Sequence, residues 1–205
     1  MYCVSEYAQK EIEHQINVEC RILYNYVPDR YFKSKRKKSI RVKFAIIGTI
    51  EERKGIDVCI NAFNMLKTQV DNCELHIVGR TLEWQRLYWE PLMTQIDADD
   101  TIFYHGEIQN RDELMQFYEK MDVIIVASRD ESCSLVALEA AMMGKVLIVS
   151  QNVGAQYLVK HINGFVFQSG NIKQLAKGMK KYVKTQWLNL SLIHISEPTR
   201  RVVIS

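Results

Sequence analysis

Proline, glycine and long apolar runs are all scarce in this 205-residue sequence, which contains 3 prolines and 9 glycines. These low contents exclude collagen-like and Pro/Gly-rich disordered chains, and 47% apolar with 25% charged residues is typical of a globular protein. No apolar run approaches the roughly 18 residues of a membrane-spanning helix. The net charge of +3 is small, so the composition indicates no nucleic-acid partner.

Cysteine is present, but the spacing of the cysteines indicates no functional site. The five cysteines are scattered, odd in number and never in C-x-x-C spacing, so neither a disulfide framework nor a zinc site is indicated. Free cysteines fit a reducing cytosol. Residues 1–6 also lack the charged head and apolar stretch of a secretory signal. We therefore expect a cytoplasmic protein.

The familiar cofactor motifs are also missing. No G-x-G-x-x-G follows an apolar run and no G-x-x-x-x-G-K-[ST] occurs, which disfavours dinucleotide enzymes and Walker-type NTPases. The five histidines show no metal-ligand spacing. Two of them, His76 and His105, fall inside apolar runs, and we interpret them as core or edge residues.

Five short, continuous apolar runs dominate the sequence from about Arg41 onward. They cover residues 43–48, 74–79, 101–106, 122–128 and 145–150. Continuous hydrophobicity, in contrast to alternation, is typical of strands that are buried on both faces of a parallel sheet.

Helical patterns fill the gaps between these runs. The first gap has one apolar stripe, made by Ile56, Cys59, Ile60, Phe63, Leu66 and Val70. Further helices are expected where Leu87, Leu92 and Ile96 recur, around residues 114–118, and over residues 135–143 and 172–184. Strand and helix alternate five times, which predicts an α/β fold with a doubly wound parallel sheet.

The composition divides the chain into three parts. Residues 1–40 are interpreted as the end of an earlier domain and a basic linker, residues 41–184 as the main domain, and residues 185–205 as a tail. The basic run from Lys33 to Lys38 is taken as solvated, with contact to lipid headgroups or nucleic acid as the alternative. From about residue 190 the tail resembles the translation of a sequencing adapter and is taken as an assembly artefact, a genuine edge strand being the alternative.

In a doubly wound sheet, ligands lie in the crevice at the carboxyl ends of the strands. Gly48, Gly79 and Gly106 end three of the runs, where glycine either lets the backbone approach a ligand or simply begins a short loop. Lys54 follows Gly48 by six residues, at the expected start of a helix. The free amides and partial positive charge of a helix start, together with this lysine, predict a phosphate site, with a solvated surface lysine as the alternative.

A second group of residues surrounds the fourth expected helix. Ser134 or Ser132 as N-cap leaves the next amides facing the crevice, where they can bind a diphosphate. Glu131 precedes this cap, and Glu139 follows Glu131 by eight residues. Because the neighbours of Glu139 are apolar, its carboxylate needs a partner, which is either a sugar diol or a nearby lysine or solvated edge.

Taken together, these groups resemble a known family. The resemblance rests on Gly48, Lys54 and Gly55, on Glu131 and Glu139 around a capped helix, and on Gly154 and the Asn163-Gly164 turn. Their order and spacing are similar to the C-terminal, nucleotide-sugar-binding domain of retaining GT-B glycosyltransferases of the glycosyltransferase group 1 family (family 4). The similarity covers about residues 41–184 and implies a Rossmann-like domain. Residues 1–40 then resemble the end of the family's N-terminal domain and its linker.

The resemblance implies a role for each of these residues in binding a nucleotide-diphosphate sugar. Lys54 would neutralise the diphosphate leaving group, and Glu131 would contact and orient the transferred sugar, so these two are the catalytic candidates. Glu139 would hold the ribose hydroxyls. The other donor-binding candidates are Gly48, Thr49, Arg80, the base-binding Gly106, Glu107 and Ile108, and the amides around Cys133, Ser134 and Leu135. Positive groups replace Mg²⁺ in this family, so no metal and no cofactor are implied.

The sequence departs from the family pattern at three places. Thr49 stands where many relatives have arginine, and Arg80 is the expected substitute. Residues 132–135 contain no glycine where Phe-Gly-Leu is common, which leaves the geometry of the amides open. Gln156 replaces a glutamate.

The implied reaction is metal-independent, retaining transfer of a hexose from a UDP- or GDP-sugar to a polysaccharide or lipid-linked acceptor. The acceptor site belongs to the family's N-terminal domain, so we expect this chain alone to bind without transferring. Peripheral contact with the inner face of the membrane is a further expectation. The alternatives are a non-catalytic nucleotide-binding or interaction module on the same fold and, less favoured, a dehydrogenase.

Overall fold

The computed structural model describes residues 2–16, 18–25, 27, 41–162 and 164–188. Its centre is a six-stranded, fully parallel sheet with the order β5-β4-β3-β6-β7-β8. The strands are β3 (Val42–Ile47), β4 (Cys73–Val78), β5 (Ile102–Tyr104), β6 (Val123–Val126), β7 (Val146–Ser150) and β8 (Phe165–Phe167). The predicted doubly wound α/β fold is confirmed, and the short β8 is a strand that the sequence analysis missed.

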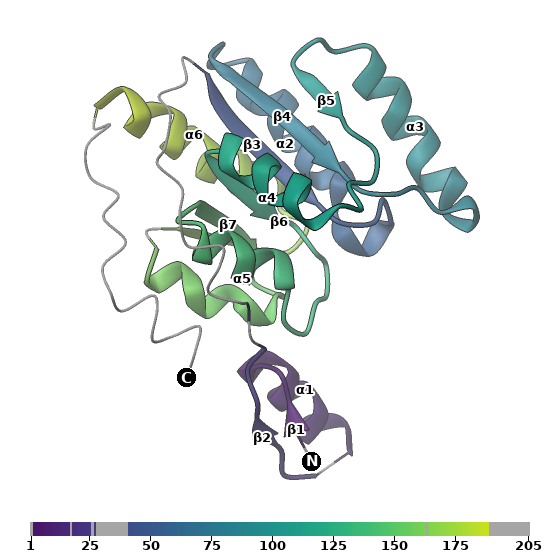
Figure 1. Cartoon of the computed structure of the whole chain (residues 1–205), viewed down its shortest axis with the longest axis vertical. Coiled ribbons are helices and arrows are strands. Elements are labelled where there is room, and N and C mark those ends of the chain that lie inside the picture. Colours follow the sequence, from purple (N-terminus) through teal and green to yellow (C-terminus); the bar gives the residue numbers. More distant parts are fainter. Residues whose placement is uncertain (1, 17, 26, 28–40, 163, 189–205) are drawn as a thin grey trace.

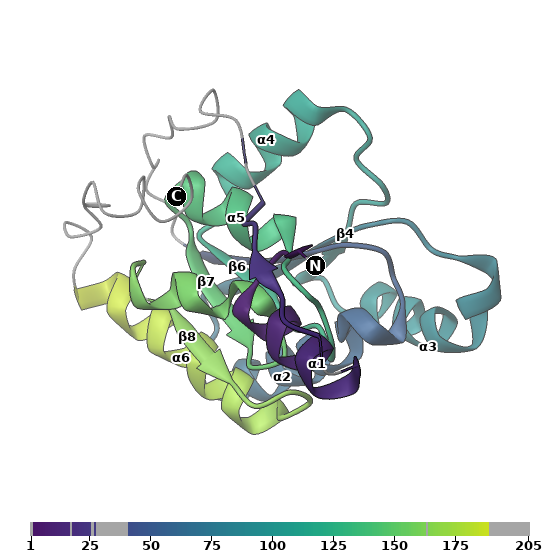
Figure 2. The same cartoon turned by 90° about the horizontal axis from the view of Figure 1, so that it is seen from below.

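Helices cover both faces of this sheet. On one face lie α2 (Ile56–Lys67), α3 (Arg86–Asp97) and α6 (Ile172–Leu188), and on the other lie α4 (Arg111–Lys120), α5 (Leu135–Met142) and the 3-10 helix η4 (Gly154–Lys160). Figure 2 shows the two layers on opposite sides of the strands. In the described residues, no helix combines the length and the hydrophobicity needed to span a bilayer.

Side chains of the strands contribute to two hydrophobic cores, one on each face of the sheet. Phe44 and Ile46 of β3 pack with α2 and α6, whereas Ala45 between them faces the α4 and α5 side. Six of the eight residues of α5 are buried, which suits its largely apolar sequence, and Glu139 is its one charged residue. The helix expected where Leu87, Leu92 and Ile96 recur is α3, although Leu87 is 94% exposed and takes no part in the buried stripe formed by Leu92 and Ile96.

The N-terminal residues form a separate small unit (Figure 1). Strands β1 (Tyr2–Cys3) and β2 (Arg21–Ile22) pair in parallel, and α1 (Glu6–Ile16) connects them over a core of Cys3, Ala8 and Cys20. Three predicted features lie outside the described residues: the basic run from Lys33 to Lys38, Asn163 of the expected turn, and the tail from residue 189. The interpretations given for them above stay predictions.

The strand order creates a switch point in the middle of the sheet. Strand β3 continues through α2 to β4 on one side, whereas its other neighbour, β6, leads away through α5 to β7. The two connections therefore diverge where β3 and β6 end. This is the position at which open α/β sheets bind their ligands.

Candidate functional site

The loop after β3 brings Lys54 back over the end of its own strand. A Cβ built on Gly48 would lie 3.5 Å from the Lys54 Cε, so the lysine stem runs across this glycine. The short 3-10 helix η2 (Glu52–Lys54) ends at Gly55, whose φ is +68°. A Cβ on Gly55 would overlap the carbonyl oxygen of Ala127 at the end of β6, so glycine is required for α2 to start there.

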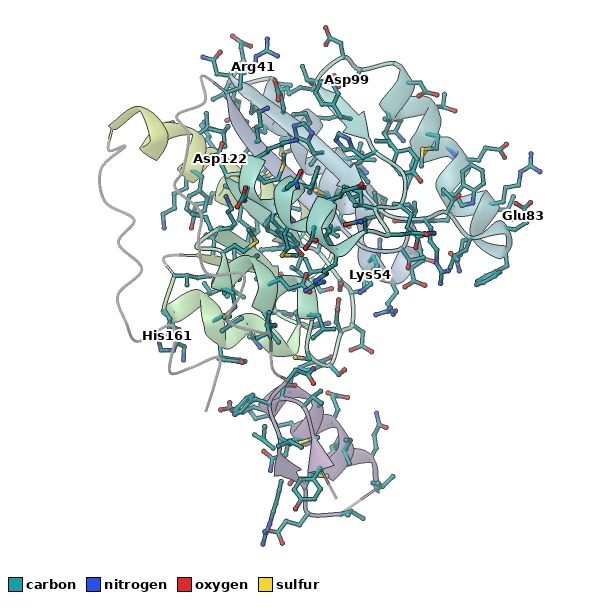
Figure 3. All side chains as sticks on the ribbon, in the orientation of Figure 1. Arg41, Lys54, Glu83, Asp99, Asp122 and His161 are labelled. Carbon is teal, nitrogen blue, oxygen red and sulfur yellow. The ribbon has the colours of Figure 1, made fainter. Side chains whose placement is uncertain are left out.

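Lys54 meets Glu131 across the switch point. The Lys54 Nζ lies 3.0 Å from the Glu131 Oε2, and the Ser128 Oγ donates to the same oxygen at 2.5 Å. The two charged side chains are only 19% and 14% exposed. Figure 3 shows Lys54 at the end of the sheet opposite Arg41 and Asp99. The two catalytic candidates, 77 residues apart in sequence, are thus in direct contact.

A second charged contact, which the sequence analysis missed, fixes the loop after β6. Arg129 donates two hydrogen bonds to the Asp57 carboxylate, at 3.1 and 2.7 Å, and a third to the backbone oxygen of Glu52. The Tyr88 hydroxyl donates to Asp57 at 2.7 Å. Burial raises the pKa of Asp57, but these hydrogen bonds from Arg129 and Tyr88 outweigh it and hold the pKa below its ordinary value. The start of α2 is therefore clamped to the loop that carries Glu131.

The start of α5 has an unusual backbone. Ser134 is the N-cap, and its φ of +80° is the one positive φ at a non-glycine residue in the described chain. Its Oγ accepts a hydrogen bond from the Ala137 amide at 3.3 Å. The amides of Leu135 and Val136 also lie in the first turn of α5, where no preceding carbonyl of the helix can accept from them. Such strain at a helix start is common at binding sites.

Cys133 beside this cap is a buried, neutral thiol. Burial raises its pKa and the negative charge of Glu131 acts in the same direction, whereas a hydrogen bond with Asn25 opposes them. A thiol needs a lowered pKa to act as a nucleophile near neutral pH. The side chain of Cys133 is therefore not an activated nucleophile, and it packs in the core on the α5 side of the sheet.

Glu139 is buried and already has two partners. It is 6% exposed, accepts a hydrogen bond from Tyr118 at 2.9 Å on Oε2, and pairs through Oε1 with the Arg111 guanidinium. Burial and the nearby Glu139 charge raise the pKa of Tyr118 well above its ordinary value, so the tyrosine remains a donor. The partner is thus an arginine at the start of α4, 28 residues away, and not the lysine or solvated edge considered above. A carboxylate has about four acceptor positions, so this one keeps capacity for sugar hydroxyls.

The remaining donor-binding candidates lie at the ends of β4 and β5. A Cβ on Gly79 would overlap the carbonyl oxygen of Gly48, and the Gly79 amide donates to the Gly106 oxygen at 2.8 Å, so three strand ends meet through glycine backbone. The exposed Arg80 lies beside the loop that contains Thr49, because its oxygen accepts from the Ile50 amide at 2.9 Å.

The loop that carries the base-binding candidates Gly106, Glu107 and Ile108 connects β5 to α4. It begins at His105, which follows β5 and does not lie inside it as predicted. Among the described side chains, no group of three His, Cys, Asp or Glu is arranged to hold a metal ion.

The predicted site residues fall into two groups in the structure. Gly48, Lys54 and Glu131 are in direct contact with one another through Lys54, and Glu139 forms a second group with Arg111 and Tyr118.

The chain matches known sequences over most of its length. The family model "Glycosyl transferases group 1" matches residues 28–196. An uncharacterized glycosyltransferase of Methanocaldococcus jannaschii is 30% identical over 142 residues, which are 69% of this chain and 35% of that protein. The capsular polysaccharide biosynthesis glycosyltransferase CapM of Staphylococcus aureus is 24% identical over 154 residues, 72% of this chain and 38% of CapM.

Solved structures share the fold at lower identity. Anabaena HepE in complex with UDP and glucose superimposes with a TM-score of 0.80 and 16% identity, covering 98% of this chain and 57% of HepE. WaaG, a glycosyltransferase involved in lipopolysaccharide biosynthesis, gives 0.76 and 17%, covering 100% of this chain and 58% of WaaG. The chain spans between 25% and 51% of the length of the curated relatives that it matches. With a family model that matches most of its residues, this chain belongs to the glycosyl transferases group 1 family.

Proposed function

We propose that this domain binds the nucleotide-diphosphate sugar donor in a metal-independent, retaining hexosyl transfer. The observation that carries the proposal is the contact of Lys54 with Glu131, 3.0 Å apart at the switch point of the sheet. This contact joins a cation to a carboxylate, and the amides at the start of α5 follow Glu131 in the chain, so the groups that a sugar diphosphate needs come together at this edge of the sheet.

Lys54 has the position and charge to stabilise the leaving group. As the bond between the anomeric carbon and the phosphate oxygen breaks, negative charge accumulates on the diphosphate. Fixed positive groups in a partly buried site stabilise such charge without a large rearrangement. Lys54 is 19% exposed, and the amides of Leu135 and Val136 provide additional donors from the helix start.

The two carboxylates serve different parts of the donor. Glu131 stands next to Lys54 and therefore next to the proposed diphosphate, where it can accept hydrogen bonds from the sugar and orient its anomeric carbon. Glu139, held by Arg111 and Tyr118, is the acceptor for the ribose hydroxyls. Backbone groups of residues 106–108 then face the base.

The proposed reaction proceeds through an anomeric carbon with oxocarbenium character. The nucleoside diphosphate leaves with the electron pair of the broken bond, an acceptor hydroxyl attacks from the same face, and its proton passes to the departing diphosphate. The relatives' names point to a capsular polysaccharide (CapM) or a lipopolysaccharide (WaaG) as the class of product, so we assign the acceptor to polysaccharide or lipid-linked glycans. This chain spans only part of its relatives, and we propose that acceptor binding and turnover require the rest of such a protein.

Titration calorimetry tests the proposal. The chain should bind UDP or GDP in the presence of EDTA, and HepE structures with UDP and with UDP-glucose favour UDP as the first ligand to try. Lys54→Ala should weaken binding about tenfold or more, because a charge-assisted contact contributes about 1.5–3 kcal/mol. Glu139→Ala should also weaken it.

A matched control separates the site from general charge effects. Lys67→Ala removes a lysine that pairs with Asp99, in the connection that leads into β5, and it should leave the affinity unchanged. If the wild-type chain bound neither nucleoside diphosphate, the donor-binding role would be refuted and a non-catalytic module on the same fold would replace it.

A further inference from the structure

The cation proposed to hold the diphosphate already has a carboxylate partner within the chain. Lys54 and Glu131 form an ion pair in which both side chains are less than one-fifth exposed. The same Glu131 oxygen accepts from Ser128, so two donors converge on one carboxylate oxygen. Any anion that uses Lys54 must therefore compete with this carboxylate.

The backbone of Glu131 is fixed by two hydrogen bonds to a neighbouring segment. Its amide donates to the Asn152 oxygen at 3.0 Å, and its own oxygen accepts from the Gly154 amide at 2.8 Å, so the backbone is fixed to the segment after β7. A Cβ on Gly154 would overlap the Ser132 oxygen, which shows how closely the two segments approach. The backbone that carries the Glu131 carboxylate is therefore held close to Lys54.

We propose that Glu131 acts as a built-in competitor of the diphosphate and makes the site prefer the sugar-bearing donor to the free nucleoside diphosphate. This inference rests on the proposed function. With the donor bound, sugar hydroxyls donate to Glu131 and replace Lys54 as its partner. With the free diphosphate, the carboxylate faces an additional negative charge and has no hydroxyls to accept from. The same residue thus favours donor binding and product release.

Glu131→Gln separates this role from simple ligand contact. The amide is almost isosteric and can still accept from Lys54 and interact with Ser128, so the loop is retained while the competing charge is removed. We expect the variant to bind the free nucleoside diphosphate about tenfold more tightly, which corresponds to about 1.4 kcal/mol. The ratio of donor affinity to diphosphate affinity should fall, since the hydroxyl-accepting charge is lost as well.

The experiment compares UDP with UDP-glucose, and GDP with GDP-mannose, by titration calorimetry in EDTA. Glu51→Gln is the matched control, because it removes one negative charge from the same region, where Glu51 pairs with Arg53 and not with Lys54. It should change the affinity for the free diphosphate less than twofold. An equal gain in both variants would reduce the effect to net charge and overturn the inference.

Ser128→Ala provides an independent variant with the opposite sign. Without the hydroxyl, Lys54 becomes the main partner of the Glu131 oxygen, so the ion pair strengthens and free diphosphate should bind two- to threefold more weakly. Unchanged or weaker diphosphate binding by Glu131→Gln, with a wild type that binds, overturns this inference alone. A wild type that binds none of the four ligands overturns it together with the proposed function.

Discussion

Lowering the pH from 7.5 to 5 should destabilise the fold through one buried histidine. His76 in β4 is 7% exposed, stacks on Phe103 with ring centroids 5.0 Å apart, and lies with its Nδ1 3.0 Å from the His105 Nε2. Burial lowers the pKa of His76 to about 4, and the nearby His105 and Lys43 lower it as well, whereas the contact with Glu74 opposes the shift.

The sign and size of the effect follow from linkage. Because the folded pKa is about 4 and the unfolded value is 6.5, the unfolded chain binds the proton first as the pH falls. The stability is fully present above pH 6.5 and decreases toward pH 4. Between pH 7.5 and pH 5 the expected loss in the free energy of unfolding is about 2 kcal/mol, out of about 3 kcal/mol for the whole shift.

Urea denaturation at several pH values measures this loss. His76→Leu removes the titrating ring and should reduce the difference between pH 7.5 and pH 5 by about 2 kcal/mol, whatever its effect at pH 7.5. His105 has a pKa lowered by burial and by Lys120, so it contributes in the same direction. A His76→Leu variant that kept the wild-type slope would refute the reasoning.

Three substitutions test the backbone and the clamp by urea denaturation. Gly55→Ala should cost at least about 2 kcal/mol, because a side chain there is strained by its φ of +68° and overlaps Ala127; a smaller loss would mean that the loop adapts easily. Ser134→Gly should stabilise the fold by about 1 kcal/mol, since relief of its φ of +80° exceeds the lost cap, and a decrease would contradict the strain. Arg129→Lys should cost about 1 kcal/mol by losing the paired hydrogen bonds to Asp57, and no loss would show that the clamp is not needed.

The sheet could be predicted because its signal is local. Each of the longer strands coincides with one continuous apolar run in the sequence, and its residues are nearly all buried, as in β6. The helices between the strands show the helical spacing of apolar residues. Strands β1, β2 and β8 are two or three residues long and gave no such signal. Leu87 matched the helical spacing of Leu92 and Ile96 but lies outside their buried stripe, because periodicity does not determine where the layer above the sheet ends.

The candidate site was predictable only in part, because its contacts join distant residues. The positions of Lys54 and Glu131 could be inferred from the ends of two strands, since parallel strands bring their carboxyl ends to one edge. The partners Arg129 for Asp57 and Arg111 for Glu139 are 72 and 28 residues apart, and no spacing rule connects them. The strained φ of Ser134 was hidden as well, because serine at a helix start is ordinarily an unstrained cap.

The sheet and the charged edge above it are held by different interactions. The strands are fixed by apolar packing, whereas three charged contacts join the loops and helix starts at the edge: Lys54 with Glu131, Arg129 with Asp57, and Arg111 with Glu139 of α5. Each of these cations has a carboxylate partner within the chain. Under the proposed function, a ligand anion would have to exchange partners with a carboxylate, and its affinity would depend on how well the released carboxylate is satisfied. Because a sugar hydroxyl can donate to Glu131 and a bare phosphate cannot, the proposed selectivity for the donor would follow from this pairing.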